Sequence, residues 1–368
     1  MVRLLAVVGT RPEAVKMAPV IRRLRWERGF RVRICVTAQH RGMLDAMLRV
    51  FQLRPHTDMN LMRADQAPGA VLRRVLRGME RVLAREKPDL VLVQGDTTAA
   101  LGAALAAFHH QVPVAHVEAG LRTGDLSNPF PEEANRVLVD RISALHFAPT
   151  PGARRNLLRE GVRPASISVT GNTAVDALLW ACGRRRRFRH RPLRRLGPEP
   201  LVLVTLHRRE SFGAPLERVF RTILEAARRR PDLRWVFPVH PNPAVRLPAR
   251  RILRHPRILL TPPLDYLDFV MLMKRASLIV TDSGGIQEEA PSLGKPVIVV
   301  REKTERPELL AGGGVLAGTS RATLLRALLH PARPVSSGPA RNPFGDGQAS
   351  ERIARALRRW AAARDLRP

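Results

Sequence analysis

Residues 89–120 read DLVLVQGDTTAALGAALAAFHHQVPVAHVEAG, two continuous apolar runs with a segment of helical length between them. Continuous apolar strands that alternate with helices are typical of a parallel sheet covered on both faces. The same alternation extends from the first residues to residue 172 and starts again near residue 200. The sequence therefore predicts an α/β fold with two doubly wound, Rossmann-like domains and an interdomain cleft.

The pattern also predicts where each domain begins and ends. We expect a first domain over residues 1–172, completed by a C-terminal helix at 350–368, and a second over 173–349 with an arginine-rich linker at 183–198. The apolar runs predict these strands: 3–9, 31–38, 89–95, 112–120, 144–150, 166–172, 200–207, 234–240, 257–263, 277–285 and 295–302.

The net charge of +31 invites a nucleic-acid-binding interpretation. However, only five of the 63 basic residues are lysine, and arginine is spread over nearly every predicted helix. Such a bias is typical of a codon preference acting on permissive surface positions, so we expect no specific nucleic-acid partner. The dense cluster at 183–195 remains open: it is a solvated hinge or helix end, or else a site for phosphate or a polyanion.

Composition excludes several other classes. No apolar run has the length needed to span a bilayer, so no membrane association is expected. The opening residues have too short an apolar core for a signal peptide, which predicts a cytoplasmic protein. Cys35 and Cys182 provide neither a disulfide framework nor a metal cluster. Without a serine nucleophile motif, acyl chemistry is not expected either.

Two carboxylates follow neighbouring strands in the first half. Asp96 comes directly after the run at 89–95, and Glu118 lies at the end of the next run. Because right-handed crossovers commonly place consecutive strands side by side, we expect both side chains at one edge of the sheet. Carboxylates that close have pKa values pushed apart, which suits one as acid and one as base. For Asp96 the alternative is an N-cap of the helix that follows.

A second acidic pair opens the helix predicted after Pro131. Glu132 and Glu133 occupy its first turn, where the helix dipole favours negative charge. Arg136 can pair with either glutamate by helical spacing. Spacing therefore leaves open which of the two is available for chemistry.

Phosphate-binding features follow strands in both halves. Arg11 and Lys16 lie near the start of the first helix, where anions are favoured. The second half contains TDSGGIQEEAPSLGKP from residue 281, in which a strand leads through Ser283, Gly284 and Gly285 into a helix. Neither a dinucleotide fingerprint nor a Walker lysine motif is present, which disfavours NAD and ATP. Glu289 is placed to accept from ribose hydroxyls, and Arg306 to add a second cation for a diphosphate.

Histidines also follow strands in the second half. His207 and Arg208 come after the run at 200–207, and His240 ends the next run. Two histidines at adjacent strand ends favour a functional role over a purely structural one. Their spacing does not complete a zinc site, so no metal is expected.

With these motifs in order, the chain resembles the non-hydrolysing UDP-N-acetylglucosamine 2-epimerases over almost its whole length. The resemblance implies a GT-B-type fold, a homodimer and no cofactor. It also implies interconversion of UDP-GlcNAc and UDP-ManNAc through elimination of UDP and its re-addition to 2-acetamidoglucal, supplying sugars for surface polysaccharide. The motifs that carry it are GTRPEAVKMAPV, CVTAQHRGMLD, GDTTAALGAALAAF, HVEAGLRTGD, PFPEEANR, VTGNTAVDALLW, HRRESFG, TDSGGIQEEAPSLGKPV, TERPE and NPFGDGQASERI.

The resemblance assigns roles to individual residues. It implies catalytic roles for Asp96, Glu118 and Glu132, and a substrate contact for His207. It implies a UDP site made of Arg11, Lys16, Phe269, Ser283, Gly284, Gly285, Glu289 and Arg306, with Phe269 near the uracil. A second, allosteric UDP-GlcNAc site resembles Gln39, His40, Gln66, Arg208 and His240, although Gly42 and Asp65 depart from the pattern of the relatives.

Three related activities remain alternatives at this point. They are an epimerase for a modified UDP-HexNAc, a hydrolysing epimerase that releases ManNAc, and a GT-B glycosyltransferase that uses a UDP-sugar. A polyanion-binding protein is the alternative from another class, and it gives no reason for carboxylates at two strand ends.

Overall fold

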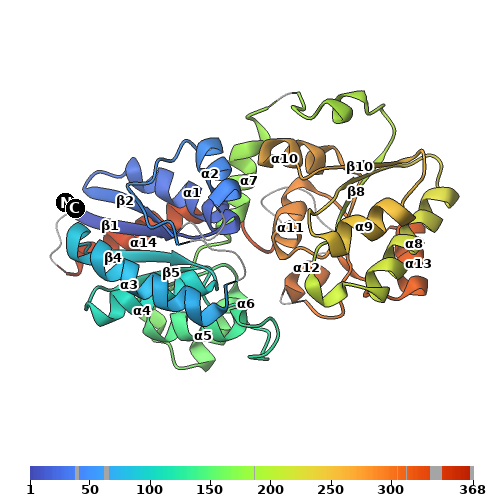
Figure 1. Cartoon of the computed structure of the whole chain (residues 1–368). Coiled ribbons are helices and arrows are strands. Elements are labelled where there is room, and N and C mark those ends of the chain that lie inside the picture. The colour runs from blue at the N-terminus through green and yellow to red at the C-terminus, as the bar shows by residue number, and fades with distance from the viewer. Residues whose placement is uncertain are drawn as a thin grey trace. The chain divides into compact units, whose positions relative to one another are not determined.

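The computed structural model describes residues 1–37, 41–61, 66–185, 187–304, 306–311, 313–331 and 342–364. The chain divides into two compact units, Met1–Ala177 with Phe344–Pro368, and Leu178–Pro343. Each unit contains one sheet, of seven strands in the first and six in the second (Figure 1). All the paired strands run parallel, which confirms the predicted α/β class.

The first unit has the strand order β3-β2-β1-β4-β5-β6-β7. The chain therefore builds outward from β1 in one direction, returns, and continues from β4 in the other. Its elements are β1 (Val2–Val8), α1 (Arg11–Arg25), β2 (Phe30–Val36), α2 (Arg41–Val50), β3 (Thr57–Asp58), α3 (Pro68–Glu86), β4 (Leu90–Gln94), α4 (Thr98–His109), β5 (Val114–Val117), α5 (Glu132–Ile142), β6 (Leu145–Ala148), α6 (Pro151–Arg159), η1 (Pro164–Ser166), β7 (Ile167–Val169) and α14 (Ala349–Ala362).

The second unit repeats this arrangement with the order β10-β9-β8-β11-β12-β13. Helix α7 (Thr173–Cys182) contains the point at which the chain passes from the first unit to the second. The elements are η2 (Arg191–Arg195), β8 (Leu201–Thr205), η3 (Arg209–Ser211), α8 (Ala214–Arg229), β9 (Arg234–Pro238), α9 (Pro243–Ile252), β10 (Ile258–Thr261), α10 (Tyr266–Arg275), β11 (Leu278–Thr281), α11 (Gly284–Glu289), η4 (Ala290–Leu293), β12 (Val297–Val299), α12 (Pro307–Ala311), β13 (Val315–Leu316) and α13 (Arg321–Leu329).

All eleven predicted runs contain a strand, and in the described part of the chain the two strands that sequence reasoning missed are both short. β3 and β13 have two residues each and lie at an edge of their sheets. Two residues are too few to produce a periodic pattern. Strand order reverses between β1 and β4, and again between β8 and β11. In such sheets ligands bind beyond the carboxyl ends of the strands at the reversal.

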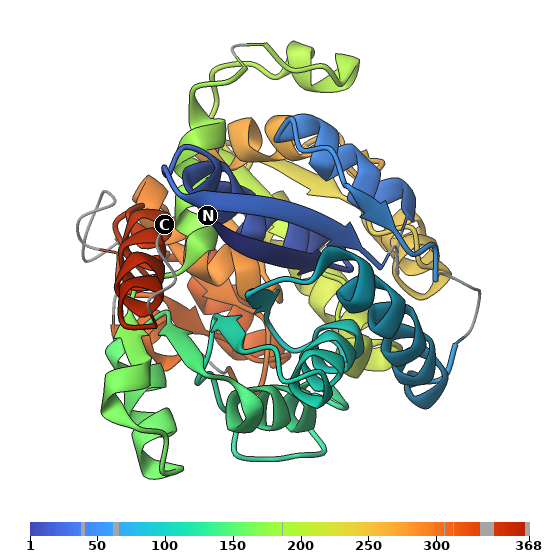
Figure 2. The same ribbon diagram turned by 90° about the vertical axis from the view of Figure 1, so that its left-hand side faces the viewer.

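The C-terminal helix α14 packs against α1 in the first unit (Figures 1 and 2). Glu351 pairs with Arg23 at 2.5 Å, and Arg358 pairs with Glu27 at 2.9 Å. At the start of α14, the amide and the hydroxyl of Ser350 donate hydrogen bonds to Asp176 of α7, at 2.8 and 2.6 Å. These contacts join the last helix to a unit that is otherwise built from the first half of the chain.

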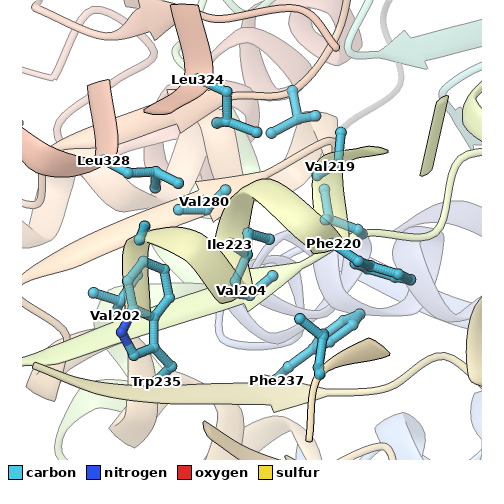
Figure 3. Close-up of a cluster of buried hydrophobic side chains, with 14 of the residues drawn as sticks. Val202, Val204, Val219, Phe220, Ile223, Trp235, Phe237, Val280, Leu324 and Leu328 are labelled. Carbon is cyan, nitrogen blue, oxygen red and sulfur yellow. The ribbon is translucent and has the colours of Figure 1, made fainter. Parts of the chain in front are cut away.

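The core of the second unit lies between its sheet and helices α8 and α13 (Figure 3). Trp235 and Phe237 of β9 meet Phe220 and Ile223 of α8, all at most 1% exposed. Burial on this scale is the dominant favourable term in folding.

No helix in the described part of the chain is long and apolar enough to cross a bilayer.

The arginine-rich segment after α7 is anchored by acidic residues of the second unit. Asp268 of α10 accepts hydrogen bonds from the amides of Arg189 and His190, at 2.8 and 2.7 Å. Arg185 contacts the same carboxylate at 2.8 Å, and Arg184 lies 4.4 Å over the Trp180 ring. These contacts hold the segment against α10, and phosphate or polyanion binding by its other arginines stays an open alternative.

Asp268→Asn should lower the free energy of unfolding by about 2 kcal/mol at pH 7, because hydrogen bonds to a charged acceptor are lost. Burial alone would raise the pKa of Asp268, but the amides of Arg189 and His190 and the Arg185 guanidinium outweigh it and lower the pKa. A lowered folded pKa stabilises the protein above the unfolded pKa, and this contribution disappears as pH falls through the folded pKa. The loss should therefore shrink at acid pH, as measured by denaturant unfolding.

The matched control is Asp232→Asn, which removes a carboxylate that is 53% exposed beside Arg230. It should have little effect at either pH, because exposed ion pairs contribute little. A loss for Asp268→Asn that stays constant down to acid pH would contradict the prediction.

Candidate active site

The carboxyl ends of β4 and β5 bring the segments of Asp96 and Glu118 to one edge of the first sheet. The two strands pair in parallel with Gln94 opposite Val117, and the Gly95 amide donates to the Val117 carbonyl at 3.1 Å. Gln94 Nε2 donates to Glu118 Oε2 at 3.1 Å. The structure therefore places Asp96 and Glu118 after two adjacent strands, as the sequence predicts.

Glu118 is held in an uncommon backbone conformation with a basic partner. Its φ of +70° lies in the left-handed region, which non-glycine residues seldom adopt. Residues with this geometry cluster at functional sites. The Lys16 ammonium from α1 pairs with Glu118 Oε2, and the two side chains are only 11% and 9% exposed. Lys16 and Glu118 thus form a nearly buried ion pair between α1 and the end of β5.

Asp96 is not the N-cap of α4. The hydroxyl of Thr97 accepts from the Ala100 amide at 3.1 Å and caps the helix in its place. The carboxylate of Asp96 instead pairs with the buried Arg136 of α5. The capping explanation of Asp96 was wrong because the next residue, also a good cap, fits the cap position.

The structure separates the two adjacent glutamates of α5. Glu133 is 1% exposed and accepts from the amides of Thr123 and Gly124, at 2.8 and 3.0 Å. It also pairs with Arg136 at 2.9 Å. Glu132 is partly exposed, and within the described ranges its side chain has no ion pair or hydrogen bond. Glu133 therefore shapes the loop before α5, whereas a catalytic role for Glu132 stays a prediction.

Glu13 joins the loops after β1 and β4, and sequence reasoning gave it no role. Its carboxylate accepts from the Thr97 hydroxyl at 2.7 Å, from the Thr10 amide at 3.2 Å, and from the Gly9 amide. Burial raises the pKa of Glu13 above its ordinary value. The capping-box spacing of Thr10 and Glu13 was a visible signal for the local part of this arrangement.

In the second unit, Asp282 organises the segment that carries the histidines. It is 1% exposed and accepts from the amides of His207 and Arg208, at 2.7 and 2.9 Å. Its other oxygen lies 3.2 Å from His207 Nδ1. The His207 ring stacks on His240, with centroids 5.6 Å apart. The two histidines thus lie side by side at the ends of β8 and β9.

Arg306 lies against the first turn of α11, and its role as a second cation for a diphosphate stays a prediction. A Cβ atom on Gly284 would lie 2.6 Å from the Arg306 guanidinium carbon, so only glycine permits this approach. Glu288 holds the guanidinium from the other side, with 2.7 Å between Arg306 Nε and Glu288 Oε1. Ser283 N donates to the Thr281 hydroxyl at 2.9 Å. Sequence reasoning missed the role of Glu288.

The remaining predicted residues lie in several places. Phe269 is half-buried on α10, Glu289 is buried at the end of α11, and Arg11 is exposed at the start of α1. Of the predicted allosteric site, Gln39 and His40 lie outside the described residues, as does Asp65. Gln66 contacts Arg74, and Arg208 follows β8. The allosteric site stays a prediction. Across the described segments, no group of three or more His, Cys, Asp or Glu residues could hold a metal ion.

Comparison with known proteins places this geometry in a family. The sequence model of the UDP-N-acetylglucosamine 2-epimerase family matches residues 22–358. A UDP-N-acetylglucosamine 2-epimerase of Yersinia pestis is 49% identical over 97% of this chain and 98% of its own length.

Solved structures extend the likeness to the fold. The UDP-GlcNAc 2-epimerase of Neisseria meningitidis bound to UDP-GlcNAc has a TM-score of 0.90 and 40% identity, covering 97% of this chain and 100% of its own. The Methanocaldococcus jannaschii enzyme in complex with UDP-GlcNAc and UDP has a TM-score of 0.84 and 37% identity, covering 96% and 99%. These scores confirm the GT-B-type class that the resemblance implied. With close to half of its residues identical to such an enzyme over nearly its full length, the chain belongs to the UDP-N-acetylglucosamine 2-epimerase family.

Proposed function

We propose that this protein interconverts UDP-GlcNAc and UDP-ManNAc without net hydrolysis. The observation that carries the proposal is the pair of acidic residues that follow β4 and β5, each with a buried basic partner, Lys16 for Glu118 and Arg136 for Asp96. Inverting C2 requires one group that removes its proton and another that returns a proton to the opposite face. Two carboxylates with different partners are suited to that division.

In the proposed reaction, a carboxylate removes the C2 proton and the C1–O bond breaks with the electron pair leaving on UDP. This gives 2-acetamidoglucal. A proton then adds to C2 from the opposite face, and UDP re-forms the bond at C1. We assign the proton transfers to Asp96 and Glu118, with Glu132 assisting, and a substrate contact to His207. No cofactor takes part.

The departing UDP needs fixed positive charge, which preorganised groups supply without reorganisation. We assign its diphosphate to Arg306 and the Ser283–Gly285 turn, with Arg11 and Lys16 contributing, and its ribose to Glu289. Phe269 is assigned to the uracil. The buried Glu288 supports this assignment because it fixes the Arg306 guanidinium beside Gly284.

One NMR time course with UDP-GlcNAc in deuterated buffer tests the proposal. We expect UDP-ManNAc to appear with deuterium at C2 in both epimers. Free ManNAc and UDP would indicate a hydrolysing epimerase instead. A glycosyltransferase would form no UDP-ManNAc without an acceptor. Turnover of a modified UDP-HexNAc but not of UDP-GlcNAc would indicate an epimerase for that modified sugar.

Gly284→Ala should weaken UDP binding about tenfold, because a lost charge-assisted hydrogen bond contributes roughly 1.5–3 kcal/mol. The new methyl group would displace the Arg306 guanidinium from Glu288. Isothermal titration with UDP measures the affinity, and denaturant unfolding should show a lower stability. Gly285→Ala is the matched control for stability, since a Cβ there meets nothing within 4 Å. Equal stability of the two variants would contradict the steric argument.

The homodimer and the supply of sugars for surface polysaccharide, which the resemblance implies, stay predictions. So does activation by UDP-GlcNAc, for which initial rates on UDP-ManNAc with and without traces of UDP-GlcNAc are the direct measurement.

A further inference from the structure

A buried polar network lies beneath the segments that carry Asp96 and Glu118. At its centre are His116 of β5 and Asp140 of α5, which are 0% and 1% exposed. His116 Nδ1 lies 2.6 Å from Asp140 Oδ1, and His116 Nε2 lies 2.9 Å from the Gly95 carbonyl. Neither residue is used in the reaction proposed above.

This network contacts the backbone at two glycines, Gly95 beside Asp96 and Gly120 two residues after Glu118. Gly95 directly precedes Asp96, so the contact of His116 Nε2 fixes the end of β4. Asp140 Oδ2 accepts from the Gly120 amide at 3.0 Å, which fixes the chain two residues after Glu118. Gly120 has a φ of +85°, and a Cβ there would lie 2.3 Å from the Ala153 carbonyl oxygen. The chain at this point has little freedom to adopt another path.

The His116 ring bridges the two segments through both of its nitrogens. A carbonyl oxygen only accepts, so Nε2 carries the proton of the contact with Gly95. On the other side, Nδ1 lies 2.6 Å from Asp140 Oδ1, while Asp140 Oδ2 accepts from the Gly120 amide. A buried ring held at both nitrogens keeps the two segments at a set separation.

Arg122 completes the network at its outer edge. It donates to Asp140 Oδ2 at 2.8 Å and pairs with Glu160 at 2.7 Å. On the same helix as Asp140, Asn135 donates to the Asp96 carbonyl at 2.9 Å. Helix α5 therefore contacts the chain after β4 through Asn135 and the chain after β5 through Asp140.

We propose that His116 and Asp140 are positioning residues that set the separation of the Asp96 and Glu118 carboxylates for proton transfer at the sugar. The inference rests on the proposed function of these carboxylates. Neither residue touches substrate, and their contribution is made through the backbone at Gly95 and Gly120. A misplacement of about 1 Å can lower a rate about 100-fold, which is the effect expected here.

Two substitutions divide the contacts of His116. Asparagine presents its amide near the position of Nδ1 and keeps the contact with Asp140, whereas glutamine reaches the position of Nε2 and keeps the contact with Gly95. Because the proposal needs both contacts, His116→Asn and His116→Gln should each lower deuterium exchange at C2 about 100-fold. Their affinity for UDP should change much less than the exchange rate, since Arg306 and the Ser283–Gly285 turn, which are assigned to its diphosphate, belong to the other unit.

The chain offers a matched control in His146, which lies opposite His116 in the register of β5 and β6. It is 2% exposed and contacts the backbone carbonyl of Asp140 at 2.8 Å, but neither of the two glycines. His146→Asn and His146→Gln remove an equally buried histidine. They should lower thermal stability as much as the His116 variants while keeping the wild-type exchange rate.

The outcomes are distinct. A wild-type protein that shows no exchange at C2 would overturn the proposed function. A wild-type protein that exchanges, with His116 and His146 variants equally impaired or equally active, would overturn the positioning role. If the His116 variants do not fold, Arg122→Gln removes one donor to Asp140 from the edge of the network. It should lower exchange with UDP affinity intact, and unchanged exchange would again overturn the inference.

Discussion

Glu118→Gln should lower the rate of deuterium exchange at C2 of UDP-GlcNAc about 1000-fold, within the range that general bases contribute. The amide is the same size as the carboxylate but cannot accept the C2 proton. UDP affinity should change little, because every residue assigned to the diphosphate is retained, including Lys16, the partner of Glu118. Exchange is measured by NMR in deuterated buffer, and UDP binding by titration.

The neighbourhood of Glu118 requires a second variant. The Lys16 side chain is 11% exposed, so the glutamine variant leaves a buried ammonium without its carboxylate. Breaking a buried ion pair on one side is strongly destabilising. The double variant Lys16→Met with Glu118→Gln should therefore recover stability relative to Glu118→Gln without recovering exchange.

The control for charge removal is Glu351→Gln, which takes a carboxylate from an ion pair with Arg23 in the same unit. It should leave exchange unchanged. If Glu118→Gln also exchanges at close to the wild-type rate, Glu118 is not part of the mechanism.

Glu132→Gln and Glu133→Gln should affect different properties, although the residues are adjacent: the first the exchange rate, the second the stability. Glu133→Gln should lower the free energy of unfolding by about 3 kcal/mol, because it leaves the buried Arg136 with a weaker partner. It also weakens the acceptor for the Thr123 and Gly124 amides. Glu132→Gln should leave stability unchanged and lower exchange about 100-fold, as loss of an acid–base group does.

Denaturant unfolding and deuterium exchange measured on both variants separate the two roles. Loss of stability in Glu132→Gln, or full stability in Glu133→Gln, would reverse the assignment made from their burial.

The positions of the main elements could be predicted from the sequence because each apolar run is long enough to show its period. The locations of Asp96, Glu118, His207 and the Ser283–Gly285 turn followed from the same pattern, since each begins within two residues of the end of a strand. Even the capping box of Thr10 and Glu13 is a local signal. The two-residue strands β3 and β13 gave no such signal.

Side-chain partners were not predictable in this way. Spacing allowed Arg136 to pair with either glutamate of α5, and only the packing of the loop at Thr123 and Gly124 selected Glu133. Likewise, no spacing rule indicated that α1 brings Lys16 to Glu118, 102 residues away. Glu288 and Asp140 were missed because their partners, Arg306 and His116, are distant in the sequence.

The sequence by itself determined the α/β class, the strand ends that carry polar residues and the family. Helices and strands each have a fixed period, so a segment that is long enough shows its type in the spacing of its apolar residues. The tertiary structure alone decided which carboxylate is buried, which cation it pairs with and which residues hold the strand ends in place. Those choices depend on distances of a few ångströms between segments far apart in the chain, and such distances exist only after the sheet and helices have packed.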